Sequence, residues 1–196
     1  MEKNINKDDL NKILDFLNFL NMKELKTICD KFNISYNIYI ENKGNIKKTS
    51  EVDHKETIIN NISFYLKTDK LPDKTLYQNK IINYEPLTIV NKDDKIYYGQ
   101  YKTTNKKILE LLKTLTNGKF KFGAISQKII RKYWKDNKLI TYNNFAKLWL
   151  KEYEKGDIKY PELAYNQFMK KHGSTEDWYK LRNNILKIFQ KYNLLN

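Results

Sequence analysis

The chain has 196 residues, of which 40% are hydrophobic and 14% aromatic, enough to form a hydrophobic core without disulfide bonds. Its formal charge of +14 at pH 7 and isoelectric point near 9.5 favour a polyanionic partner. The single cysteine, Cys29, excludes an intrachain disulfide, and no run approaches the roughly 18 apolar residues of a membrane span. The N-terminus lacks the apolar segment of a secretory signal, so we expect an intracellular, cytoplasmic protein without a membrane partner.

The positive charge is unevenly distributed along the chain. Residues 1–70 carry 12 lysines against 11 acidic residues, and residues 71–102 carry 5 against 4, so both segments are nearly neutral. Residues 103–156 carry 13 Lys or Arg against 4 acidic residues, and residues 157–196 carry 7 against 4. The electrostatic footprint of a polyanion is therefore predicted to centre on residues 106–138.

Hydrophobic periodicity predicts two short helices at the start of the chain. Leucine and isoleucine recur at helical spacing over residues 10–20, behind Asp8 and Asp9 as candidate N-caps. The pattern restarts over residues 21–32, where Asn21 and Glu24 have the spacing of a capping box. These patterns predict two successive short helices.

The next stretch alternates between irregular and regular patterns. Periodicity fails over residues 35–50, where we expect an extended loop, and resumes in a helix that begins at Asp53 and ends before Pro72. Residues 71–86 contain prolines and no helical stripe, which predicts a linker. Residues 87–101 hold two short β-prone runs around an Asn-Lys-Asp-Asp turn, which predicts a small β-hairpin.

The rest of the chain has helical periodicity, with caps expected at Thr104, Thr141 and Ser174. Two of the helix pairs have similar patterns, which indicates a degenerate repeat over residues 120–153 and 162–193. The predicted helices span residues 104–115, 125–136, 141–153, 163–172 and 174–188. The fold class predicted from these patterns is mainly α with a small β-hairpin.

The first third of the chain resembles the SAP motif, a helix, an extended loop and a second helix associated with DNA binding in many proteins. The matching positions are Leu20 and Leu25, the Phe32-Asn33-Ile34 end of the first helix, the Gly44–Lys48 loop and the Ile58, Ile59 and Ile62 stripe. The C-terminal part is similar to an uncharacterised domain that follows a SAP-like motif in small, mainly bacterial proteins. The resemblance implies a SAP-like module over residues 1–70, joined by the linker at 71–86 to a basic, mostly helical domain over 87–196.

The loop around Gly44 is the first candidate phosphate-binding feature. A Walker A loop needs a second glycine and a helix that starts directly after its Lys-Ser/Thr pair, and only Gly44, Lys48 and Thr49 match, so we reject nucleotide hydrolysis. Two interpretations stay open: a solvated polar loop, or a loop that offers Lys43, Lys47, Lys48 and a helix N-terminus to a DNA phosphate.

The second candidate is the predicted helix over residues 125–136, where basic side chains lie opposite the apolar stripe. An ordinary solvated face is the alternative, but the near absence of acidic residues favours binding. Arg131 is one of two arginines, so its planar fork indicates a specific phosphate, carboxylate or guanine contact. The predicted nucleic-acid-binding residues are Lys43, Lys47, Lys48, Lys106, Lys107, Lys119, Lys121, Lys128, Arg131, Lys132, Lys135 and Lys138. The aromatic residues that interleave with these lysines suggest base stacking, with core packing as the alternative: Tyr97, Tyr98, Tyr101, Phe120, Tyr133 and Trp134.

Catalytic signatures are weak. His54 and His172 lie far apart in sequence, and neither has a cysteine or second histidine at metal-ligand spacing. We therefore expect no cofactor, no metal and no enzymatic activity; a nuclease would require distant acidic residues to converge. The expected function is low-specificity nucleic-acid binding, with DNA as the partner, RNA not excluded, and a nucleoid-associated location. The alternative is a helical adaptor for an acidic protein partner.

Overall fold

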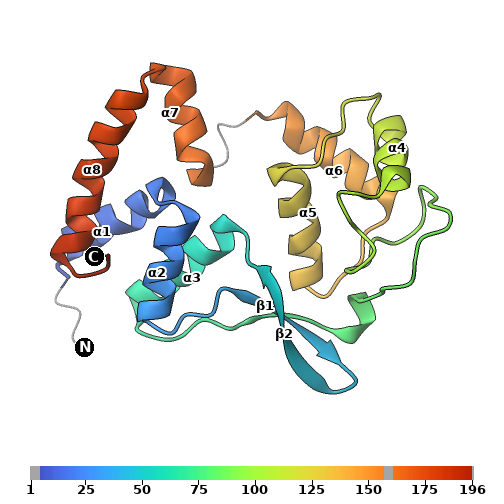
Figure 1. The fold of residues 1–196 in the computed structure, drawn as a ribbon, viewed down its shortest axis with the longest axis horizontal. Coiled ribbons are helices and arrows are strands. Elements are labelled where there is room, and N and C mark those ends of the chain that lie inside the picture. Colours follow the sequence, from blue (N-terminus) through green and yellow to red (C-terminus); the bar gives the residue numbers. More distant parts are fainter. Residues whose placement is uncertain (1–4, 157–160, 196) are drawn as a thin grey trace. The chain divides into compact units, whose positions relative to one another are not determined.

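The structure is a computed structural model that describes residues 5–156 and 161–195, within which eight α-helices and one three-stranded sheet form (Figure 1). The chain is mainly α-helical with a small β element, which confirms the predicted fold class. It divides into two compact units, each assembled from separated stretches of sequence. Unit 1 comprises Met1–Tyr36, Asp53–Lys74 and Asp157–Asn196, and unit 2 comprises Asn37–Val52 and Thr75–Gly156.

This division differs from the predicted modules at residues 1–70 and 87–196. Two non-local associations explain the difference. The segment Asn37–Val52 lies between two helices of unit 1 in sequence but belongs to unit 2, where it pairs with a strand at residues 75–77. The C-terminal segment after residue 160 packs with the N-terminal helices. Neither composition nor local periodicity encodes these associations.

In the part of unit 1 that the structure describes, all regular secondary structure is helical, and local sequence signals fix several helix ends. The predicted capping box forms: the Asn21 side chain accepts from the Glu24 amide and the Glu24 carboxylate accepts from the Asn21 amide. The first helix begins earlier than predicted, with Asn6 as its cap in place of Asp8 or Asp9. The helices of unit 1 are α1 (Lys7–Phe16), α2 (Met22–Lys31), α3 (Lys55–Thr68), α7 (Ala164–His172) and α8 (Thr175–Lys191).

The core of unit 1 is aliphatic. Among the described residues its buried cluster contains one aromatic side chain, Phe189, and otherwise isoleucine, leucine and Cys29. The helix α8 packs on α1, and α2 packs on α3, so the first and last helices of the chain enclose the same core. Burial raises the pKa of the Cys29 thiol to about 12, in keeping with a small buried apolar residue.

Residues 37–52 form a β-hairpin, where an extended loop was predicted. Strand β1 (Asn37–Asn42) pairs antiparallel with β2 (Asn45–Val52) across a two-residue turn. Lys43 and Gly44 both have positive φ, +50° and +79°, the signature of the mirror-image turn that suits a hairpin. Glycine adopts a positive φ without steric cost, so the Gly44 noted in the sequence marks the turn of this hairpin.

The sheet is completed by β3 (Thr75–Tyr77), which pairs parallel with β1 to give the order β2-β1-β3. The predicted linker at residues 71–86 is therefore wrong for most of its length: Tyr77 and Ile81 are buried in the core of unit 2.

The hairpin predicted over residues 87–101 does not form either. The backbone amides of this stretch pair with distant segments, because Ile96 donates to Ile140 at 2.9 Å and Tyr98 donates to Ile81 at 2.9 Å.

Unit 2 adds three helices and an aromatic core. Among the described residues, the core of unit 2 contains sixteen that are buried, of which eight are aromatic, and the aromatic rings meet mostly edge to face. The predicted caps are confirmed at Thr141 in this unit and at Ser174 in unit 1, while Asn105 replaces Thr104. The helices are α4 (Lys106–Leu115), α5 (Ala124–Lys135) and α6 (Tyr142–Glu154).

The two helix pairs of the predicted repeat both form, α5 with α6 in unit 2 and α7 with α8 in unit 1. Their internal similarity stays a prediction. None of the helices formed by residues 5–156 and 161–195 is long and apolar enough to cross a membrane.

Candidate functional site

The two units differ sharply in charge. Unit 2 carries 20 Lys or Arg against 9 acidic residues, a net charge of +11, whereas unit 1 carries 17 against 14, a net charge of +3. All twelve predicted nucleic-acid-binding residues belong to unit 2, including the three lysines of the hairpin. The fold therefore brings the Gly44 loop and the basic helix, which are about 80 residues apart in sequence, into one compact unit.

The hairpin presents its three lysines in different directions. Lys43 lies in the turn, while Lys47 and Lys48 are consecutive exposed residues of β2, opposite Ile40 and Tyr39 of β1. Because consecutive side chains of a strand point to opposite faces, Lys47 and Lys48 cannot contact one phosphate from the same face. The predicted loop with a helix N-terminus beside it does not form, since α3 begins only at Lys55, in unit 1.

The basic face of α5 forms in part as predicted. Lys132 and Lys135 are exposed, and so is Lys138, just beyond the helix. Lys128 and Arg131 are half-buried. The four remaining predicted lysines are exposed on unit 2, at the start of α4 and between α4 and α5: Lys106, Lys107, Lys119 and Lys121.

Arg131 has a defined structural contact. Its Nη1 donates to the Val52 carbonyl at 2.6 Å, and its Nη2 lies 3.3 Å from the Glu51 carboxylate. The other oxygen of that carboxylate accepts a hydrogen bond from the Tyr98 hydroxyl at 2.9 Å. Burial, reinforced by the Glu51 charge, raises the pKa of Tyr98. The fork of Arg131 thus binds a carboxylate of its own unit. A hollow of about 400 Å³ is lined by Arg131, Glu51, Tyr98 and Lys102, among other residues.

The interleaved aromatic residues lie mostly in the core. Tyr98, Tyr101, Phe120 and Trp134 are between 0% and 8% exposed, so they cannot stack on bases, and core packing is the correct interpretation for them. The aromatic contribution to this surface is consequently small.

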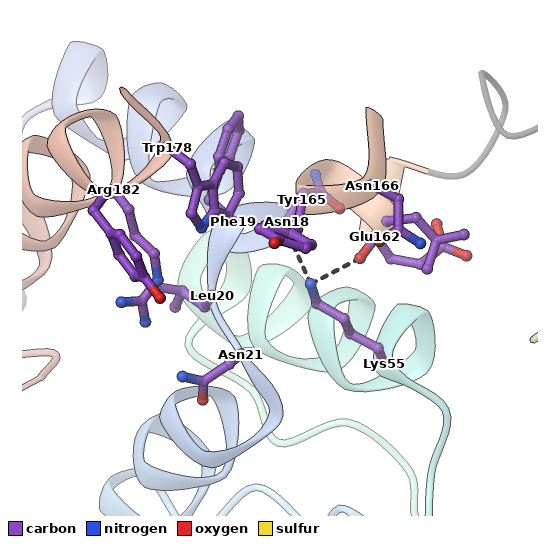
Figure 2. Close-up of a pocket in the computed structure, with 12 residues that line it drawn as sticks. Asn18, Phe19, Leu20, Asn21, Lys55, Glu162, Tyr165, Asn166, Trp178 and Arg182 are labelled. Atoms are coloured by element: carbon purple, nitrogen blue, oxygen red, sulfur yellow. Dashed lines mark hydrogen bonds between the residues drawn. The ribbon is translucent and has the colours of Figure 1, made fainter. Parts of the chain in front are cut away.

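In addition to the hollow in unit 2, a pocket of about 360 Å³ lies in unit 1, and Lys55 is one of the residues that line it (Figure 2). The Lys55 ammonium donates to the carbonyl oxygens of Asn18 and Glu162, each at 2.8 Å, and burial lowers the pKa of Lys55 to about 8. An aromatic wall flanks this pocket, with the Trp178 ring stacked on Phe19 at a centroid distance of 5.7 Å. Sequence reasoning did not identify this pocket, because its walls come from three separate stretches.

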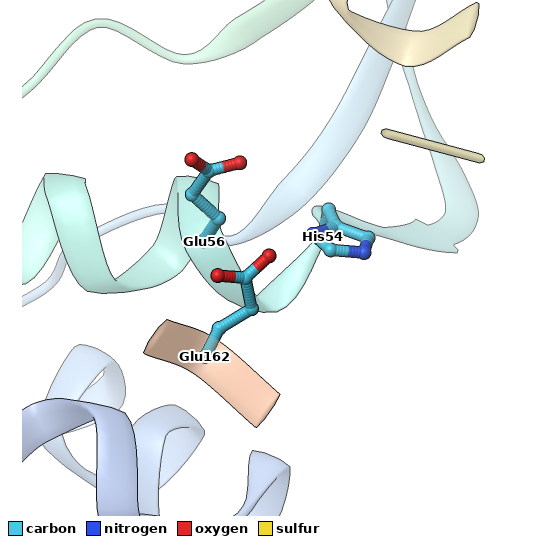
Figure 3. Close-up of side chains that lie close together, drawn as sticks. All are labelled: His54, Glu56 and Glu162. Atoms are coloured by element: carbon cyan, nitrogen blue, oxygen red, sulfur yellow. The ribbon is translucent and has the colours of Figure 1, made fainter. Parts of the chain in front are cut away.

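Beside Lys55, three potential metal ligands converge (Figure 3). One ligand atom from each of His54, Glu56 and Glu162 lies within 4.8 Å of the others. His54 and Glu56 flank Lys55 at the start of α3, and Glu162 comes from the 3₁₀ turn Pro161–Leu163. Sequence spacing between histidines and cysteines gave no signal for this group, because its third member is 106 residues away from its second.

No family model, curated protein or solved structure matches the chain. The SAP resemblance therefore stays a prediction.

Proposed function

We propose that the protein is a non-enzymatic nucleic-acid-binding protein that uses the basic surface of unit 2 to bind the sugar-phosphate backbone, with duplex DNA as its preferred ligand. The observation that carries this proposal is the concentration of a +11 net charge, out of +14, in one unit. Exposed lysines act as point charges that neutralise phosphates and release counterions, which gives affinity without sequence selection.

Low sequence specificity follows from the intramolecular contacts of the two arginines. The commonest base-specific contact is a bidentate arginine to guanine. Arg131 is engaged with Glu51 and Val52, and Arg182 is ion-paired with Glu24 in unit 1. Neither guanidinium is presented as an open fork, so lysine–phosphate contacts supply most of the affinity.

A preference for duplex over single strands follows from the buried aromatic residues. Non-specific single-strand binding relies on exposed rings that stack on successive bases. Tyr98, Tyr101 and Trp134 instead pack on one another within unit 2. Backbone contacts on a regular duplex remain the best match for a lysine-rich surface of this kind.

The test is a salt series of binding to matched duplex DNA, single-stranded DNA and duplex RNA, by fluorescence anisotropy. We expect the logarithm of the association constant to fall linearly with log salt, with a slope of about −0.9 per duplex phosphate contact. Duplex DNA is expected to bind more tightly than the single strand. Absence of binding at low salt, or equal affinity for polyglutamate, would contradict the proposal; the latter result would favour an adaptor for an acidic protein. Nicking of a plasmid incubated with Mg²⁺ or Mn²⁺ would contradict the non-enzymatic part.

A further inference from the structure

The side chains of His54, Glu56 and Glu162 point toward a common space in unit 1 (Figure 3). They come from only two short segments, the start of α3 and the turn Pro161–Leu163. Glu162 is 4% exposed, whereas His54 and Glu56 are half-buried. A cation stabilises a buried carboxylate that lies near a second carboxylate, because burying a negative charge is costly and the second negative charge adds repulsion.

The contacts of Lys55 hold the two segments together. Its ammonium binds the backbone carbonyl of Glu162 and that of Asn18, so the turn carrying Glu162 is fixed to the first turn of α3 (Figure 2). Lys55 also contributes one positive charge near the Glu162 carboxylate.

The donor set selects the class of cation. One imidazole nitrogen and two carboxylate oxygens suit Zn²⁺, Mn²⁺ or Fe²⁺, whereas Mg²⁺ and Ca²⁺ prefer oxygen ligands alone. In a tetrahedral zinc site with bonds of about 2.0–2.2 Å, ligand atoms lie about 3.4 Å apart. Ligand atoms within 4.8 Å of one another would have to approach by at most about 1.4 Å to reach that separation.

We propose that His54, Glu56 and Glu162 bind one divalent transition-metal ion, for which Zn²⁺ is the probe, and that the ion clamps the turn Pro161–Leu163 to the start of α3. Three protein ligands leave one position for water. The site lies wholly in unit 1 and is independent of the proposed nucleic-acid function of unit 2. Cys29, the chain's one thiol, does not compete for zinc, because it is fully buried and burial raises its pKa to about 12.

The test is isothermal titration of the chelator-treated full chain with Zn²⁺, with thermal unfolding measured on the same samples. We expect one zinc ion per chain and a rise in melting temperature on binding, because the metal binds only the folded state. Glu162→Gln and His54→Ala should each weaken zinc binding at least tenfold, while Mg²⁺ should compete poorly. Substitution of Co²⁺ should give the visible absorption bands of a tetrahedral site, and these should disappear in Glu162→Gln.

The matched control is the double variant His172→Ala and Glu176→Gln, which removes an exposed histidine and an exposed glutamate of unit 1. This control should bind zinc as the unmodified chain does. Zinc affinity that is equal in Glu162→Gln and in the unmodified chain, or that is lost in the control, would overturn the proposal. Circular dichroism confirms that each variant is folded. DNA affinity, which depends on unit 2, should be unchanged in Glu162→Gln, so failure of either proposal is recognised separately.

Discussion

Unit 1 and unit 2 use charge and aromatic residues in opposite ways. Unit 2 buries its rings and carries a lysine surplus outside, whereas unit 1 has an aliphatic core and turns ionisable groups inward, at Lys55 and Glu162. A net charge of +11 on one unit and +3 on the other favours polyanion binding on the surface of unit 2. In unit 1 the candidate metal ligands are three side chains that the fold brings together, His54, Glu56 and Glu162, and the net charge of the unit does not reveal them. Changing one unit and measuring the response of both therefore tests this difference.

The largest effect is expected from Phe120→Ala in unit 2. Phe120 is fully buried and its ring contacts those of Phe145 and Trp149, so truncation leaves a cavity and costs about 3–5 kcal/mol of unfolding free energy. Hydrogen exchange measured by mass spectrometry should show faster exchange in α4, α5 and α6, with α1, α2 and α8 unaffected. Equal acceleration in α1 and α8 would show that the two cores do not unfold separately.

Neutralising the exposed lysines of the last turns of α5 and Lys138 just beyond it tests where the DNA affinity lies. The triple variant Lys132→Gln, Lys135→Gln and Lys138→Gln should lower affinity for duplex DNA on the order of 10- to 100-fold at low salt, and the salt slope should become shallower by about 0.9 for each phosphate that is no longer neutralised. Glutamine is preferred to glutamate because a negative charge in the last turn of α5 would also oppose the helix dipole.

Two triple variants serve as comparisons for this measurement. Lys43→Gln, Lys47→Gln and Lys48→Gln should have a smaller effect, since Lys47 and Lys48 point to opposite faces of the hairpin. Lys70→Gln, Lys171→Gln and Lys187→Gln, in unit 1, should have the smallest. A larger loss of affinity from the hairpin variant would place the main DNA contact at the hairpin, and a larger loss from the unit 1 variant would refute the assignment to unit 2.

Arg131→Lys is expected to cost about 1–2 kcal/mol, because an ammonium cannot reproduce the fork that binds Val52 and Glu51 together. The ion pair with Glu51 is partly exposed, so most of this cost comes from the bond to the Val52 carbonyl. Faster amide exchange should be confined to unit 2. The corresponding change in unit 1, Arg182→Lys, breaks the pair with Glu24 and should accelerate exchange in unit 1 instead. If both variants perturb the same amides, the two arginines do not stabilise separate units.

Local signals in the sequence were sufficient for the helices and insufficient for the way the units are assembled. The capping box at Asn21 and Glu24 is predictable because its two hydrogen bonds join residues three apart. The hairpin was missed because its turn is Lys43-Gly44, a weaker signal than Asn-Gly, although alternation of isoleucines is visible in the strand before it. The interleaving of units depends on β1 pairing with β3, more than 30 residues away in sequence, and no local pattern encodes such a partner.

The same contrast applies to the candidate sites. The basic surface of unit 2 was predictable because lysines can be counted directly in the sequence, and each lysine carries its charge wherever the fold places it. The convergence of His54, Glu56 and Glu162 was not predictable, because it requires the C-terminal segment to return to α3. Arg131 was predicted to contact a phosphate, a carboxylate or a guanine and was counted among the nucleic-acid-binding residues; that its partner is the Glu51 carboxylate depends on the hairpin.

Gly44→Ala tests whether the hairpin stabilises unit 2 despite lying between helices of unit 1 in sequence. Gly44 has φ of +79° with open space around it, so the added methyl group meets no neighbour and the cost, about 1 kcal/mol, is that of the left-handed backbone conformation. Gly44→Asn should cost less, because asparagine tolerates this region. Thermal unfolding should detect both changes, and exchange should rise in β1 and β2 while α2 and α3 stay protected. Equal costs for alanine and asparagine would contradict the conformational explanation.

The smallest effect concerns the junction of the two chain ends in unit 1, and it depends on pH. Asp9 of α1 accepts hydrogen bonds from Lys191 at 2.8 Å and from Tyr192, and these bonds, chiefly the one from Lys191, lower the pKa of Asp9 from 3.8 to about 2. A carboxyl group with a lowered pKa in the folded state contributes stability above the unfolded pKa, and this contribution disappears as pH falls through the folded value. Asp9→Asn should therefore lower the melting temperature at pH 7, and the difference should shrink as pH falls and vanish below pH 2. Because the pair joins α1 to the end of α8, exchange at pH 7 should rise in these two helices and leave unit 2 unchanged. A difference in melting temperature that is the same at both pH values would show that the Asp9 charge is not responsible.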